Sequence, residues 1–240
     1  MTTFFLNRLA TEPHALAFAG QSTPWPVALA DQTTDPSLDE ALRGHVAAAN
    51  RLLTPVAADL LATTGRPVDL FGFTPNPARL GAAADATASV EGVALTQLGA
   101  LLDLEHLGYS VAQAKPLAVL GHSQGVLAVH MARAIEAAGS IEAAGKTLDE
   151  ILAVAALIGA AGTRRVRELG LNPKYGEASP MLSVKGATRE QVEALVKRVN
   201  NARGPISIAV TNSDNHHVLS GYPEDLSAFA LEAEREHQHQ

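Results

Sequence analysis

Residues 116–138 contain the sequence feature that most limits how this chain can fold. Pro116 to Leu120 (PLAVL) is a continuous apolar run, which is typical of a buried parallel strand. Gly121-His122-Ser123-Gln124-Gly125 follows, and the next residues predict a helix from Val126 to Ala138. This order fits the G-x-S-x-G nucleophile elbow, in which a sharp strand-to-helix turn lifts a serine hydroxyl above the sheet. The motif predicts that Ser123 is a nucleophile in an α/β fold; the alternative is a solvent-facing serine in a tight turn.

The composition indicates a globular protein and excludes several classes of function. The 240 residues suffice for one or two domains, and 47% apolar against 18% charged residues excludes a mainly disordered chain. A net charge of −7 disfavours binding to nucleic acid or to an anionic membrane. The absence of cysteine excludes disulfides, cysteine-ligated metals and thiol nucleophiles. With no signal peptide and no apolar run that could span a bilayer, we expect a cytoplasmic protein.

The periodicity of apolar residues divides the chain into two parts, 1–177 and 178–240. In the first part it predicts a strand at 14–19, and helices at 36–64 with a break near Pro55, 90–108, 126–138 and about 147–169; residues 20–35 and 65–88 read as loops. In the second part it predicts strands at 181–184, 206–210 and 217–219, and helices at 188–200 and from Pro223 onward. The second order, β-α-β-β-α, is that of a split βαβ, ferredoxin-like unit without its final strand. We therefore expect a large α/β subdomain and an incomplete small one.

Two classes of enzyme use such an elbow: the α/β-hydrolases with a Ser–Asp/Glu–His triad, and the acyl-carrier-protein transacylases with a Ser–His pair. Four segments resemble the second class, in its order: HALAFAGQS (14–22), VALTQLGAL (93–101), GHSQG (121–125) and NSDNHHVLSG (212–221). GHSQGVLAVH together with LIGAAGTRR resembles the acetyltransferase domain of bacterial, actinobacterial-style type I fatty acid synthases, which are similar to the fungal β-chain. The resemblance implies an α/β-hydrolase-like parallel sheet with a nucleophile elbow, plus a ferredoxin-like small subdomain.

The resemblance also implies a reaction. Ser123 would take an acetyl group from acetyl-CoA as an ester and pass it to the phosphopantetheine thiol of an acyl carrier protein. The backbone N–H groups of Gln21 and Gln124 would form the oxyanion hole, and His122 would brace the turn. Acetyl-CoA is then a substrate, no bound cofactor or metal is implied, and the partners are the carrier protein and other fatty acid synthase domains.

Specificity is expected to depend on Ile158. Malonyl-loading relatives carry an Arg-Gly pair in the helix after the elbow, where the guanidinium holds the malonyl carboxylate. The resemblance places Ile158-Gly159 at this pair, which suits an acetyl methyl group; a shift of register would place Arg164 or Arg165 there instead. Other short acyl starters stay open, because an apolar pocket discriminates one methylene by only about 1–3 kcal/mol.

Two further residues match positions near the active site of the family. Gln97 matches a glutamine near the nucleophile, and it would equally suit a hydrogen bond within a buried helix. Asn212 matches a residue of the small subdomain, and it would equally suit an Asx turn before a strand. Both enter the expected site as substrate-binding residues.

The general base of the family is a histidine that follows the small subdomain. Because one helix follows Gly221 and the sequence then stops, we expect a fragment whose base lies beyond residue 240. His216 and His217 are the alternatives inside the chain. Two other functions stay open: a serine hydrolase or thioesterase that uses water as acceptor, and a non-catalytic scaffold or carrier-docking fragment.

Overall fold

The structure is a computed structural model, and it describes residues 8–9, 11–20, 25–64, 86–168, 180–199 and 205–238. The chain forms two compact units, residues 1–175 and 176–240, and each is described by itself. The sequence places this boundary two residues further on, at 177/178. Within the described ranges, no helix is both long and apolar enough to cross a membrane.

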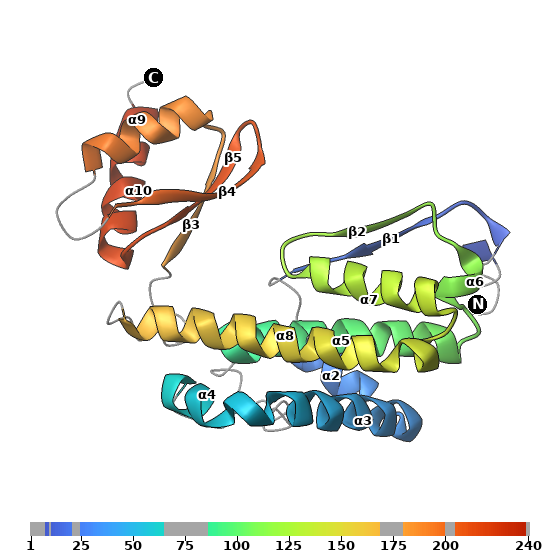
Figure 1. Ribbon diagram of the computed structural model, residues 1–240. Coiled ribbons are helices and arrows are strands. Elements are labelled where there is room, and N and C mark those ends of the chain that lie inside the picture. Colours follow the sequence, from blue (N-terminus) through green and yellow to red (C-terminus); the bar gives the residue numbers. More distant parts are fainter. Residues whose placement is uncertain are drawn as a thin grey trace. The chain divides into compact units, whose positions relative to one another are not determined.

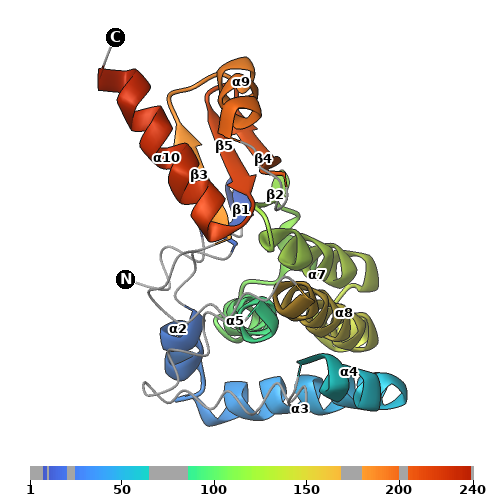
Figure 2. The same cartoon turned by 90° about the vertical axis from the view of Figure 1, so that its left-hand side faces the viewer.

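The first unit is a short parallel sheet with helices stacked on it (Figures 1 and 2). Strands β1 (Ala15–Phe18) and β2 (Ala118–Gly121) pair in parallel from Ala15–Ala118 to Phe18–Gly121. Helix α7 (Gly125–Ala138) packs on this sheet. The next layer is the pair α5 (Ala86–His106) and α8 (Ile141–Glu168). Helices α3 (Pro36–Leu53) and α4 (Ala57–Thr64) pack on α8. The short helices α2 (Trp25–Gln32) and α6 (Val111–Ala114) complete the described elements together with a 3-10 turn at Thr54–Val56, where the break near Pro55 is predicted.

The core of the first unit is centred on α5. Its residues 90–99 are all buried, and they include three polar side chains, Glu91, Thr96 and Gln97, among apolar and small ones. Two glycines of α5 accept side chains from α2: a Cβ on Gly92 would overlap the ring of Trp25, and one on Gly99 would lie 2.7 Å from the Cδ of Gln32. Close approach to α5 therefore holds α2 in place.

Helix α2 corrects the expectation of a loop over residues 20–35. Pro26 occupies the first turn of α2, where proline is tolerated, and Trp25 and Leu29 are buried one turn apart. Two apolar anchors in eight residues are too few to show a helical period, so the sequence pattern misses α2. Its formation depends on packing against α5.

The exposure of β2 differs from the expectation for PLAVL. Leu117 is 76% exposed and Leu120 is 57% exposed, although an apolar run predicts a strand buried on both faces. Within the part of the chain that the structure describes, the sheet has two strands, and α7 packs against it. The prediction of a parallel strand is confirmed, and the prediction of its burial is wrong for these two side chains.

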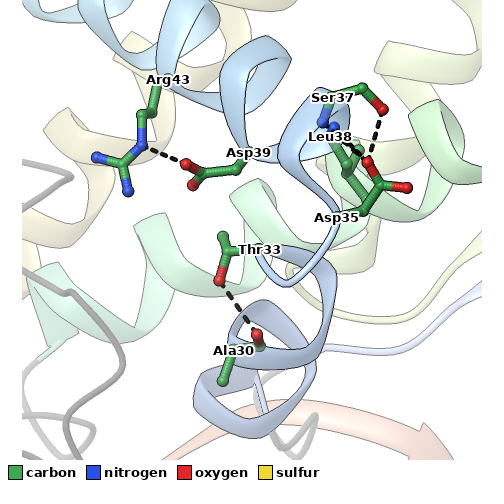
Figure 3. A network of polar contacts seen from close by, with 7 residues as sticks. All are labelled: Ala30, Thr33, Asp35, Ser37, Leu38, Asp39 and Arg43. Carbon is green, nitrogen blue, oxygen red and sulfur yellow. Dashed lines mark hydrogen bonds and ion pairs between the residues drawn. The ribbon is translucent and has the colours of Figure 1, made fainter.

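Asp35 caps α3, and its contacts carry a pH dependence (Figure 3). One carboxylate oxygen accepts from the Ser37 hydroxyl at 2.6 Å and from the backbone N–H groups of Ser37 at 2.8 Å and Leu38 at 3.3 Å. These bonds, that from the Ser37 hydroxyl above all, hold the pKa of Asp35 below its ordinary value. The stabilisation is therefore complete above the ordinary pKa of an aspartate and is lost as the pH falls through the lowered one.

We expect Asp35→Ala to lower the thermal midpoint at neutral pH, because the first turn of α3 loses its acceptor. Asp35→Asn keeps the cap and removes the titration. The midpoint of this variant is expected to fall less steeply than that of the wild type in the acid range. Thermal scans across this range check the expectation, and parallel curves for the wild type and Asp35→Asn would contradict it.

The second unit has the predicted order of elements. Strands β3 (Met181–Lys185), β4 (Ser207–Ser213) and β5 (His216–Ser220) form an antiparallel sheet in the order β3-β5-β4, and α9 (Arg189–Val199) and α10 (Pro223–Gln238) pack against it (Figure 2). A reciprocal capping box starts α9: Gln191 Oε1 accepts from the Thr188 N–H at 2.8 Å, and Thr188 Oγ1 accepts from the Gln191 N–H at 3.4 Å.

Candidate active site

Ser123 lies in a sharp turn between the end of β2 and the start of α7. Its φ is +55°, a left-handed conformation that is uncommon for a residue other than glycine and that recurs at functional sites. The turn is closed by the Gly125 N–H, which donates to the carbonyl of His122 at 2.9 Å. Ser123 is exposed as a residue, as a nucleophile that receives its substrate from solvent would be. These are the features of a nucleophile elbow.

The glycines at both ends of the motif are required by close backbone contacts. A Cβ on Gly121 would overlap the carbonyl of Gly125, and a Cβ on Gly125 would overlap the carbonyl oxygen of Phe18 at the end of β1. Strand β1 therefore ends directly against the first turn of α7. The G-x-S-x-G spacing follows from these two approaches together with the turn between them.

The residues after β1 contact the elbow as well. The His122 N–H donates to the carbonyl of Phe18 at 3.0 Å, which continues the pairing of β1 and β2 by one more bond. A Cβ on Gly20 would lie 2.7 Å from the carbonyl oxygen of His122, 2.8 Å from the Cβ of Ser123 and 3.3 Å from the backbone nitrogen of Gln124. Gly20 thus lies beside the nucleophile turn.

Of the two expected oxyanion donors, the structure describes Gln124 and not Gln21. Gln124 is the N-cap of α7, next to Gly20, at the end of a helix where backbone N–H groups lack intrahelical acceptors. Such a helix start favours a developing negative charge. Gln21 lies outside the described residues, directly after Gly20.

Gln97 is brought to this site from α5. Its side chain is 6% exposed, and its Nε2 donates to the carbonyl of Ala19 at 2.5 Å. The alternative of a hydrogen bond within a buried helix does not describe this contact, because the partner belongs to the segment after β1. Gln97 and Ser123 therefore both contact the segment Phe18–Gly20.

Ile158 lies on α8 and is half exposed, as are Val154 and Leu157 on the same helix. Arg164 and Arg165, the alternatives by register, are exposed near the end of α8, and each lies 3.3 Å from a carboxylate oxygen of Glu168.

Asn212 belongs to the second unit, where it lies inside β4, next to an irregularity of register between Thr211 and Ser213. The strand that the sequence predicts ends at Val210, whereas β4 runs on to Ser213. β4 continues through Asn212 because Thr211 and Ser213 both pair with β5.

Four histidines of the described residues, His14, His45, His216 and His217, form hydrogen bonds away from Ser123. His14 Nε2 lies 2.6 Å from the Tyr109 hydroxyl, His45 Nδ1 pairs with Asp149 at 2.7 Å, and His216 Nε2 lies 3.0 Å from Ser183 Oγ. His217 is fully buried in the second unit, with Nδ1 3.2 Å from Thr211 Oγ1. Its burial argues against His217 as a base for an exposed serine. In the described ranges no group of three or more His, Asp or Glu side chains could hold a metal ion.

Comparison with known proteins identifies the family. Residues 82–240 match the family described as "Starter unit:ACP transacylase in aflatoxin biosynthesis", which is more than half of the chain. The chain belongs to this starter-unit transacylase family. The "Fatty acid synthase beta subunit TOXC" of Cochliobolus carbonum is 32% identical over 123 residues, which are 46% of this chain and 6% of that protein. The expected similarity to acyl-carrier-protein transacylases and to the fungal β-chain is confirmed.

Solved structures of transacylases share the fold. The malonyl CoA-acyl carrier protein transacylase from Coxiella burnetii matches with a TM-score of 0.54 at 16% identity, over 93% of this chain and 58% of that one. The malonyl-transacylase PlMCAT, solved in complex with the type II polyketide synthase carrier protein AntF, matches with a TM-score of 0.52 at 16% identity, over 91% of this chain and 58% of that one. The chain thus spans about three fifths of these structures. They confirm the expected α/β-hydrolase-like fold.

In this member of the family, sequence reasoning missed the role of Phe18 and Ala19. Their backbone carbonyls accept from the elbow and from Gln97, and backbone acceptors leave no signal in residue identity. The available signal is Gly20, whose lack of a side chain is required by its approach to His122 and Ser123.

Proposed function

We propose that this chain transfers an acetyl starter from acetyl-CoA to the phosphopantetheine thiol of an acyl carrier protein, through an ester on Ser123. The observation that carries the proposal is the strained, exposed Ser123 between the two tightly packed glycines, beside Gly20 and the start of α7. Membership of the starter-unit transacylase family supports the same chemistry.

The reaction consists of two half-reactions, acylation of Ser123 and transfer of the acyl group to the carrier. In the first, the Ser123 oxygen attacks the thioester carbonyl, its proton passes to a base, and the C–S bond breaks to release CoA. In the second, the phosphopantetheine thiol attacks the ester, and Ser123 regains a proton as the acyl group leaves. In each tetrahedral intermediate the backbone N–H groups of Gln124 and Gln21 would stabilise the oxyanion.

The proposal also specifies partners and setting. A carrier protein is the acceptor, as supported by the structural similarity to a malonyl-transacylase that was solved in complex with one. The similarity to a fatty acid synthase β subunit supports other synthase domains as further partners. The cytoplasm is the proposed location. A thioester is already activated, so the chemistry requires neither a bound cofactor nor a metal. Asn212 is kept as a proposed substrate-binding residue.

The preference for acetyl is proposed to depend on Ile158, because an isoleucine offers no partner to a malonyl carboxylate. We expect Ile158→Arg to raise the ratio of malonyl to acetyl loading by about 10–100-fold, which corresponds to a charged hydrogen bond of about 1.5–3 kcal/mol. The measurement is the initial rate of protein acylation by malonyl-CoA and by acetyl-CoA, read from intact-protein mass.

Leu157→Arg is the matched control, because Leu157 is the neighbouring residue on α8 and is similarly exposed. It adds the same charge without placing it at the proposed acyl site. An equal rise in malonyl loading for both variants, or no rise for Ile158→Arg, would contradict the role of Ile158.

A thioesterase is the competing function, and the exposure of Ser123 is the observation that favours it, because water can reach an ester there. A labelled acetyl group distinguishes the two. With carrier protein present, a transacylase moves the label to the carrier thiol, whereas a thioesterase releases it as free acetate at the same rate with or without the carrier.

A further inference from the structure

Helix α5 holds the backbone segment that follows β1. The Gln97 amide is oriented by this contact, because the Ala19 carbonyl can only accept, so Nε2 rather than Oε1 must face it. Oε1 is itself buried and has no hydrogen-bond partner among the described residues. An unsatisfied buried oxygen costs free energy. The bond from Nε2 is kept in spite of this cost, which indicates that it holds the backbone at Ala19 in place.

The backbone held at Ala19 is directly connected to Gly20, which contacts the turn of Ser123. The carbonyl of Phe18 is held by the elbow through the His122 N–H, and the carbonyl of Ala19 is held by α5 through Gln97. Gly20 comes next and lies against the backbone of His122 and the Cβ of Ser123. The position of Gly20 relative to Ser123 is thus set from two sides.

The same stretch of α5 also holds Trp25, the next described residue. The Trp25 ring packs on Gly92, and the Thr96 hydroxyl, which donates to the Gly92 carbonyl at 2.8 Å, lies 3.4 Å from the Trp25 carbonyl. In addition, Gln32 Nε2 donates to the Thr96 carbonyl at 3.0 Å. Residues 92–97 of one helix therefore anchor both Ala19 and Trp25.

We propose that Gln97 is a positioning residue rather than a substrate-binding residue. By holding the Ala19 carbonyl it fixes Gly20 against the elbow. This inference rests on the proposed function in assigning a donor role to the Gln21 N–H. The hydrogen bond from Gln97 to Ala19 does not depend on that assignment.

The test uses Gln97→Met, which keeps the length of the side chain and removes both the donor and the unsatisfied acceptor. We expect faster amide hydrogen exchange in residues 16–20, because the Ala19 carbonyl has lost its partner. We also expect the maximal rate of Ser123 acetylation by acetyl-CoA to fall by about 10²-fold with an unchanged KM, as for an oxyanion contact that is made in the transition state.

Gln113→Met is the matched control, because Gln113 is exposed on α6. Gln97→Leu is the second variant if Gln97→Met does not fold, with circular dichroism as the check. Unchanged exchange in residues 16–20 overturns the inference, and so does a rise in KM at an unchanged maximal rate, which would make Gln97 a substrate-binding residue. If the wild type is not acetylated at all, the proposed function fails, and the exchange measurement still decides the role of Gln97.

Discussion

Ser123→Ala is expected to abolish acylation of the protein by acetyl-CoA. The variant lacks the only atom proposed to form the ester, and removal of a serine nucleophile costs about 10⁶-fold in kcat in a well-studied serine protease. Its fold is expected to persist, because alanine at a φ of +55° is no more strained than the serine that it replaces. Intact-protein mass after brief incubation with acetyl-CoA measures the effect.

Ser227→Ala is the control for this prediction, because Ser227 is an exposed serine on α10. It is expected to be acetylated like the wild type. Acetylation that survives in Ser123→Ala would remove Ser123 from the reaction. Acetylation that is lost in both variants would show that the loss in Ser123→Ala does not identify the nucleophile.

Gly125→Ala is expected to disrupt the elbow and the packing of β1. The added methyl group would overlap the carbonyl oxygen of Phe18 and lie 3.0 Å from that of Ala19, both of which are backbone atoms with little freedom to move. Overpacking of this kind costs about 1–3 kcal/mol and more where the surroundings are rigid, so we expect at least about 3 kcal/mol from the free energy of unfolding. Chemical denaturation measures the loss, and acylation of Ser123 is expected to be lost with it.

Gly44→Ala is the matched control on α3, where a Cβ would meet no atom within 4 Å. Because alanine favours a helix over glycine by about 1 kcal/mol, Gly44→Ala is expected to stabilise the protein slightly. Equal stability changes for the two variants would show that the approach of β1 to Gly125 is not as close as described.

The elbow was predictable from sequence because its determinants are local. A strand, a five-residue turn and a helix are adjacent in the chain, and the glycine spacing reflects contacts within a few residues or with one neighbouring strand. The second unit was predictable for a similar reason, since alternation in β5 and helical spacing in α9 report which face packs inward.

The features that escaped prediction depend on contacts between distant residues. Helix α2 forms because Trp25 and Gln32 fit against glycines of α5, which lie some 67 residues away in sequence. Gln97 finds its partner in Ala19, 78 residues earlier. The apolar run at β2 predicts burial, but Leu117 and Leu120 are exposed among the described residues. An apolar side chain favours burial, but its sequence does not show whether another element covers it. Apolar periodicity predicts a helix around Ile158, whereas its role in specificity is implied by resemblance alone and stays a prediction.

The most direct test of this account is to locate the acetyl group. The wild-type chain is incubated with acetyl-CoA, digested and analysed by peptide-resolved mass spectrometry. The account predicts one acetyl group on the peptide that contains Ser123, bound as an ester and discharged by a phosphopantetheine thiol. An acetyl group on any other residue, or a Ser123 peptide that stays unmodified, would contradict it.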